Sequence, residues 1–141
     1  MIDTAKWAPR VLTVLRVVTA LLFLEHATMK LLQFPAPIPG VAYPLPAIMI
    51  IAGAIEVITG VLIAVGLFTR IAAFIASGEM AAAYFMAHAP HGFWPALNMG
   101  ELAILFCFIF FYLAFVGGGA WALDNVRRPI ANQPRPEAVA V

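Results

Sequence analysis

Four long apolar stretches, separated by short polar or proline- and glycine-rich segments, set the pattern of this chain. Each is close in length to the roughly 17 to 25 residues that a helix needs to cross the hydrocarbon core of a membrane. The predicted membrane-spanning helices cover about residues 10–32, 47–67, 71–87 and 96–116. We therefore expect an all-α membrane protein, a four-transmembrane-helix bundle over residues 1–125, followed by a disordered tail over 126–141.

The segments between the apolar stretches predict how the helices connect. Five prolines between Phe34 and Pro46 exclude regular helix there, so this loop lies outside the hydrocarbon. The link Phe68-Thr69-Arg70 is very short, which predicts an antiparallel hairpin of the second and third helices with Thr69 as N-cap. The run Gly117-Gly118-Gly119 ends the fourth helix.

Small residues around a carboxyl group mark one face of the second and of the third helix. In the second helix this face carries Gly53, Glu56 and Gly60. In the third it carries Ala72, Ala76, Glu79 and Ala83. Small residues let neighbouring helices approach closely, so both faces should point into the bundle.

The fourth helix has a less even pattern. One side carries Asn98, Glu101, Leu105 and Tyr112, and the remaining directions carry Phe106, Phe108, Phe110 and Phe111. We expect the polar side to face inward and the phenylalanines to face lipid.

The composition supports a membrane protein and excludes several other classes. The chain of 141 residues is 64% hydrophobic and 11% charged, and its mean hydropathy is +0.98, whereas a soluble globular protein has about 25% charged residues. The net charge of +1 does not indicate the basic surface that a nucleic-acid partner requires. A single cysteine, Cys107, excludes an intrachain disulfide and is best read as a small hydrophobic residue.

The basic residues predict the topology. Seven of the eight fall on the side of the two termini and the short hairpin, and only Lys30 falls toward the other side. Because Lys and Arg concentrate in cytoplasmic segments, both termini should be cytoplasmic in a multi-pass protein of the plasma (inner) membrane. The seven are Lys6, Arg10, Arg16, Arg70, Arg127, Arg128 and Arg135.

Ionisable residues inside the apolar stretches are the candidate functional groups. A charged residue at the centre of a bilayer costs roughly 2.5 to 3.5 kcal/mol, so four carboxyl groups cannot all be bare anions facing lipid. Some must be protonated, or paired with Lys30, His26, His88 or Arg16. We expect the set to converge on one cavity in the outer half of the bundle. The ligand-binding or proton-exchanging candidates are Glu25, His26, Lys30, Glu56, Glu79, His88, Asn98 and Glu101.

Two interpretations of this set remain open. It can be a structural polar cluster that fixes the bundle, or a pocket for a ligand with proton-accepting groups. A metal site is not predicted, because the chain lacks the Glu-x-x-His motif of carboxylate di-metal bundles and has no diagnostic spacing around His26, His88 or His91. Haem is not favoured either, since the chain has no attachment motif.

With these residues set out, the chain resembles the DoxX family of small membrane proteins over about residues 10–125. The matching positions in the first half are Phe23-Leu24-Glu25-His26, Lys30-Leu31, Gly53, Glu56, Gly60 and Gly66-Leu67-Phe68-Thr69-Arg70. In the second half they are Tyr84, His88-Ala89-Pro90, Phe93-Trp94-Pro95, Asn98, Gly100-Glu101-Leu102, Gly117, Gly119, Trp121 and Leu123-Asp124.

The resemblance implies a four-helix membrane protein, and some relatives are named as subunits of quinol oxidase or thiosulfate:quinone oxidoreductase systems. One hypothesis is thus a subunit of a membrane oxidoreductase that binds a quinone-like ligand and exchanges electrons with a redox partner protein. The other is a non-enzymatic membrane factor that binds a partner protein or lipid, with a structural Glu/His set. Whether the chain is an enzyme stays open, as does oligomerisation, because the small-residue faces fit both internal packing and a dimer.

Overall fold

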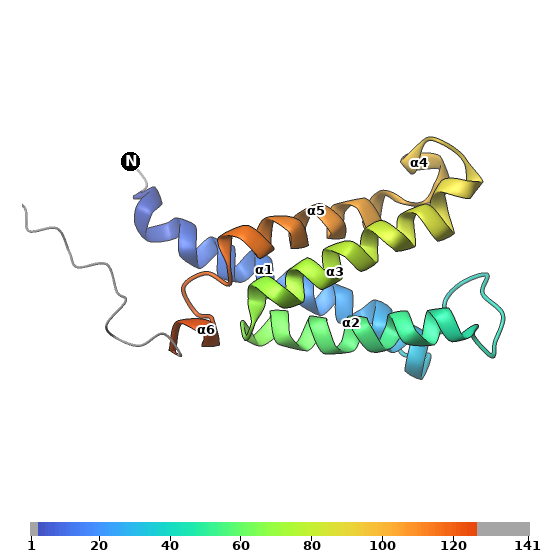
Figure 1. The fold of residues 1–141 in the computed structure, drawn as a ribbon, viewed down its shortest axis with the longest axis horizontal. Helices are drawn as coiled ribbons and strands as arrows, with labels where there is room; N and C mark the ends of the chain where they lie inside the picture. The colour runs from blue at the N-terminus through green and yellow to red at the C-terminus, as the bar shows by residue number, and fades with distance from the viewer. Residues whose placement is uncertain (1–2, 127–141) are drawn as a thin grey trace, which may run out of the picture.

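A computed structural model describes residues 3–126, and the long elements in that range are all helices (Figure 1). The predicted all-α class is confirmed. The long helices are α1 (Thr4–Leu32), α2 (Ala47–Val65), α3 (Thr69–Ala83) and α5 (Glu101–Val116). The short ones are the π-helix η1 (Tyr84–His88), the 3₁₀-helix η2 (Ala89–His91), α4 (Pro95–Asn98) and α6 (Leu123–Val126). Apart from Val126, the tail predicted to be disordered lies outside the described residues.

The helices have the length and hydropathy of membrane-spanning segments. Among the described residues, three helical stretches are long and apolar enough to cross a membrane: α1, α2, and the continuous run from Thr69 to His91. The apolar helix α5 is shorter, at 16 residues, and α4 precedes it. The chain is therefore an all-helical membrane protein.

The four long helices form two packed pairs. α1 packs along α2, α3 packs along α5, and the short link between α2 and α3 joins the pairs. Figure 1 shows the start of α1, the α2–α3 link and α6 gathered at one end, and the proline-rich loop and α4 at the other. Hydrogen bonds hold the first end together, from the Ala120 N–H to the Pro9 carbonyl and from the Asp124 N–H to the Gly66 carbonyl.

Three phenylalanines form the centre of the core. The ring of Phe23 lies 5.5 Å from that of Phe106 and 4.8 Å from that of Phe110, between centroids. The expectation that Phe106 and Phe110 face lipid is wrong: both are buried, whereas Leu105 is 58% and Tyr112 53% exposed. The large rings fill the space that the small residues of α3 leave, and this decides which side of α5 faces inward.

The predicted fourth helix is interrupted. Met99 adopts the left-handed conformation, with φ of 60°, and separates α4 from α5. The buried Asn98 stabilises the break, because its side-chain oxygen accepts a hydrogen bond from the Gly100 N–H and its amide donates to the Gly92 carbonyl, both at 2.8 Å. Asn98 thus ties the break to the loop that precedes α4.

The third helix begins and ends differently from the prediction. Its N-cap is Phe68, not Thr69, and the side chain that pairs its first N–H groups comes from the far end of the chain. The Asp124 carboxylate accepts hydrogen bonds from the Phe68 and Thr69 N–H groups at 2.7 and 2.9 Å. Helical backbone then continues beyond the predicted end at residue 87, through η1 and η2 to His91.

The first two helices lie close to their predicted ranges. α1 begins at Thr4 rather than near residue 10, because the Asp3 carboxylate accepts a hydrogen bond from the Lys6 N–H and caps the helix. α2 ends at Val65 rather than near residue 67, because Gly66 adopts the left-handed conformation at its C-cap.

Candidate functional site

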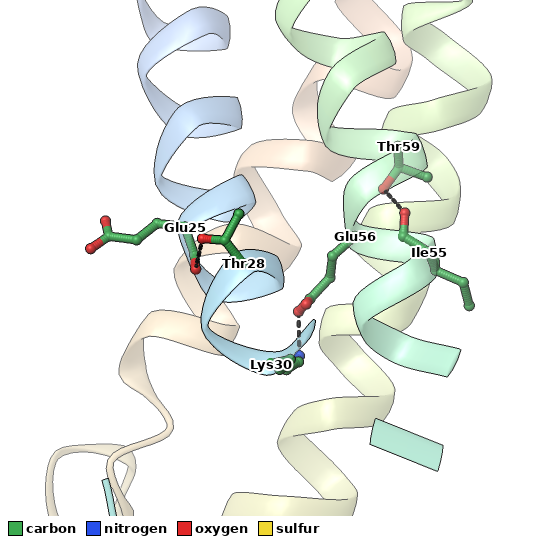
Figure 2. A network of polar contacts seen from close by, with 6 residues as sticks. All are labelled: Glu25, Thr28, Lys30, Ile55, Glu56 and Thr59. Carbon is green, nitrogen blue, oxygen red and sulfur yellow. Dashed lines mark hydrogen bonds and ion pairs between the residues drawn. The ribbon is translucent and has the colours of Figure 1, made fainter. Parts of the chain in front are cut away.

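An ion pair between α1 and α2 is the centre of the candidate site. Lys30 Nζ lies 2.5 Å from Glu56 Oε1, with Glu56 only 1% and Lys30 16% exposed at the side chain (Figure 2). Gly53 permits this contact, because a Cβ at that position would lie 3.0 Å from Leu31 Cγ and 3.4 Å from Lys30 Cβ. The inward small-residue face predicted for the second helix thus brings the two helix backbones close together.

Glu79 of α3 adds a second carboxyl group to this pair. Glu56 and Lys30 both act electrostatically on Glu79. Among the described residues, neither Glu79 carboxyl oxygen has a hydrogen-bond partner, and the same is true of Glu56 Oε2, although all three atoms are buried. An unsatisfied buried polar atom costs about 1 to 3 kcal/mol. The cluster Lys30–Glu56–Glu79 therefore has hydrogen-bond acceptors that a proton or a hydrogen-bond donor would satisfy.

His26 lies at the edge of this cluster. Its ring is half-buried and meets the Phe106 ring edge-on, with centroids 5.9 Å apart. Lys30 and Glu25 both act electrostatically on the imidazole. His26 therefore stands between the aromatic core and the charged residues of α1.

Glu25 is not part of the cluster. Its side chain is exposed, and Figure 2 shows it pointing away from Glu56. Among residues 3–126 its hydrogen bond is made by the backbone, since the Thr28 hydroxyl donates to the Glu25 carbonyl at 2.9 Å. Neighbouring residues on a helix differ in direction by about 100°, so Glu25 points away from the side of α1 on which His26 packs against Phe106.

His88 and Asn98 lie together at the junction between α3 and α5. His88 Nδ1 is 3.1 Å from the Asn98 carbonyl oxygen, and the His88 ring stacks on Tyr84. The pair holds the break before α5 in place, which is a structural role. His91 follows in η2 and is exposed.

Glu101 lies apart from the other candidates as well. It is the first residue of α5, is exposed, and lines an open hollow of about 380 Å³ with Pro95, Ile104 and Leu105. The structure therefore brings together Lys30, Glu56 and Glu79, with His26 beside them. It does not bring Glu25 or Glu101 to that place.

The residues do not form an evident metal site. Within residues 3–126, no group of three or more His, Cys, Asp or Glu side chains is arranged to hold a metal ion. The carboxyl groups of the Lys30–Glu56–Glu79 cluster can accept hydrogen bonds and exchange protons.

Sequence reasoning missed the role of Arg16. It was a candidate counterion for the carboxyl groups, but the structure places it, 1% exposed, at the opposite end of α2. Its guanidinium donates to carbonyl groups of the last turn of α2 and of the glycine-rich loop: Ile63, Ala64 at 2.6 Å, Gly118 at 2.8 Å and Trp121 at 3.3 Å. The available signal was the C-terminus of α2, which has no basic residue of its own in its last turn.

Comparisons with known proteins agree with this fold. The sequence model of the DoxX family matches residues 11–89, a segment that contains Lys30, Glu56 and Glu79. A Haemophilus influenzae protein with the name "Uncharacterized protein" is 46% identical over 132 residues, covering 89% of this chain and 96% of that protein. No solved structure gives a significant match. The chain belongs to the DoxX family.

Proposed function

We propose that this protein is a subunit of a membrane oxidoreductase and binds a quinone-like ligand at the Lys30–Glu56–Glu79 cluster. The observation that carries the proposal is the set of three buried carboxyl oxygens without a hydrogen-bond partner among the described residues. Two belong to Glu79 and one to Glu56. Such acceptors suit the hydroxyl groups of a quinol, and they suit proton uptake when the quinol is oxidised.

Each residue of the cluster would have its own role in binding the ligand or in accepting its protons. Oxidation of a bound quinol to the quinone would release two electrons, which pass to a redox partner protein, and two protons, one taken up by Glu79 and one by Glu56 through Oε2. Glu79 accepts a hydroxyl hydrogen bond and then the proton, since its oxygens have no competing donor among residues 3–126. Lys30 holds Glu56 in position through their 2.5 Å contact. His26, half-buried beside them, can donate to a ring carbonyl of the oxidised ligand.

The proposed setting is the inner membrane, crossed several times with both termini in the cytoplasm. What supports it is the grouping of basic residues at one end of the bundle. The start of α1, which carries Lys6 and Arg10, lies at the same end as the α2–α3 link with Arg70 (Figure 1). Lys30, near the other end of α1, is paired with a carboxylate. This asymmetry is typical of a cytoplasmic face.

Quinone content and ligand-induced stabilisation test the proposal. The purified protein is extracted with solvent and the extract is analysed for quinones, and thermal unfolding in detergent is followed with and without a short-chain ubiquinol. We expect wild-type protein to retain quinone and to be stabilised by the ubiquinol. Glu79→Gln should lose both effects while unfolding at the same temperature without ligand, because it replaces the free carboxyl group at nearly constant volume.

The matched control is Glu101→Gln, an exposed carboxyl group in a separate hollow. It should behave as wild type. Absence of ubiquinol stabilisation in the wild type, or equal stabilisation of Glu79→Gln, would contradict the proposal.

A non-enzymatic membrane factor is the second candidate. The Lys30–Glu56 ion pair favours it, because a direct bond between α1 and α2 stabilises the bundle whether or not a ligand binds. If the protein is such a factor, Glu79→Gln should lower the unfolding temperature. The ubiquinol should then affect the variant no differently from the wild type.

A further inference from the structure

The Glu25 side chain points out of the bundle from an otherwise apolar face of α1. It is exposed, and among residues 3–126 its carboxylate has no hydrogen-bond or ion-pair partner (Figure 2). The Glu25 carboxylate therefore has no direct contact with a polar group among these residues.

Contacts with α2 place Glu25 at mid-depth. Its neighbour Leu24 lies against Gly60, where an added Cβ would approach Leu24 Cγ to 2.8 Å. Glu56 is the middle residue of α2, and Gly60 follows about one helical turn later, about 6 Å along the axis. Glu25 is therefore within about one turn of the middle of α2, where a carboxylate exposed to hydrocarbon is strongly disfavoured and normally faces a partner.

Exposed apolar side chains continue the face of α1 on which Glu25 lies. Val18 and Val11 precede Glu25 by seven and fourteen residues, and Val14 and Leu21 lie between them. All four hydrophobic side chains are exposed. From Val11 to Glu25 the face is about 21 Å long. A single polar residue in such an apolar face can fix the register in which a second helix packs.

Within its described residues, a second copy of the chain does not supply a free basic residue to pair with Glu25 at this depth. Among the described residues within the bundle, Arg16 is buried on backbone carbonyls and Lys30 is paired with Glu56. The ring of His26 packs against Phe106 on the core side of α1. The described residues of a second copy therefore offer no free basic side chain to pair with Glu25 at this depth.

We infer that the Val11–Glu25 face of α1 binds a transmembrane helix of a partner protein, and that this helix carries a basic residue which pairs with Glu25. The inference does not depend on quinone binding, because it concerns the opposite side of α1 from the Lys30–Glu56–Glu79 cluster.

The test uses a designed transmembrane peptide of about 23 leucine and alanine residues with terminal lysines. One version carries Arg at its midpoint, and matched versions carry Gln or Leu there. Each peptide, labelled with an acceptor dye, is reconstituted in phosphatidylcholine vesicles with the full-length protein, which carries a donor dye at Ala120→Cys in a Cys107→Ser background. Energy transfer gives the association constant.

We expect the Arg peptide to associate roughly five- to thirtyfold more strongly than the Leu peptide, as a buried polar contact between membrane helices allows. Glu25→Gln should remove this preference, and the control Glu101→Gln should keep it. Because Glu25 is exposed, Glu25→Gln should unfold at the wild-type temperature.

Several results would overturn the inference. These are equal association of the Arg and Leu peptides with wild-type protein, a preference that survives in Glu25→Gln, and unfolding of Glu25→Gln in the absence of peptide. A fourth is efficient disulfide cross-linking between two copies of Val18→Cys at low protein density, which would show that the face binds a second copy of this chain.

Discussion

Arg16 joins three segments that are distant in sequence. Its guanidinium donates to carbonyl groups at the end of α2 and in the loop between α5 and α6. The last carbonyls of a helix have no partner within it and carry partial negative charge, so they stabilise a buried cation there.

Replacement of Arg16 should therefore destabilise the protein strongly. Arg16→Met keeps an apolar side chain of similar length but leaves several buried carbonyls unsatisfied, and we expect a loss of roughly 3 kcal/mol or more in the free energy of unfolding. Denaturant unfolding in detergent, followed by circular dichroism, measures it. Lys6→Met, which removes an exposed cation from α1, should change stability by less than about 0.5 kcal/mol. Similar losses in the two variants would show that Arg16 does not hold these segments together.

The Lys30–Glu56 ion pair should show strong coupling between its two members. Lys30→Met alone leaves Glu56 buried without its cation and should cost roughly 3 to 5 kcal/mol. Lys30→Met combined with Glu56→Gln removes both charges and should recover most of that loss. The same unfolding measurements on the wild type, both single variants and the double variant give the coupling energy. Additive effects would mean that the contact contributes no net stability.

At the scale of the elements, the end of α2 depends on the absence of a side chain at Gly66. Its φ is 74°, and an added Cβ would lie 2.7 Å from Ala122 Cα. The backbone of the C-terminal segment therefore packs directly on the helix end, next to the place where Asp124 caps α3.

Two glycine substitutions should have opposite effects. Gly66→Ala forces a left-handed conformation on alanine, which costs about 1 to 2 kcal/mol, and also meets the Ala122 backbone. Gly78→Ala lies within α3, where a Cβ meets nothing within 4 Å. It should be neutral or stabilise the helix by up to about 1 kcal/mol. Comparison of the two thermal unfolding midpoints checks this, and a Gly66→Ala variant as stable as wild type would contradict the close packing.

At the scale of the whole molecule, the topology can be tested directly. With both termini cytoplasmic, the proline-rich loop and the α3–α5 junction face outward. In a Cys107→Ser background, cysteines at Pro37 and Gly92 should react with a membrane-impermeant maleimide in intact cells, and the control Ala120→Cys should react only after permeabilisation. The reverse labelling pattern would invert the orientation.

The sequence alone determined the helical class, the short α2–α3 hairpin and the inward faces of α2 and α3. These follow from the length and hydropathy of the apolar stretches and from small residues repeating at helical spacing around Glu56 and Glu79. Such features depend on local composition and period, which a single sequence contains.

The tertiary structure decided which side of α5 faces inward, where its helix is broken, and which ionisable groups meet. In a membrane protein the lipid-facing and core-facing positions are both apolar, so hydropathy did not distinguish the buried Phe106 from the exposed Leu105. The partners of Arg16, and the fact that Lys30 rather than Glu25 meets Glu56, depend on how the helices rotate against one another. That rotation is set by the packing of Phe23, Phe106 and Phe110 and by the close approach at Gly53 and Gly60, which become visible only when the helices are assembled.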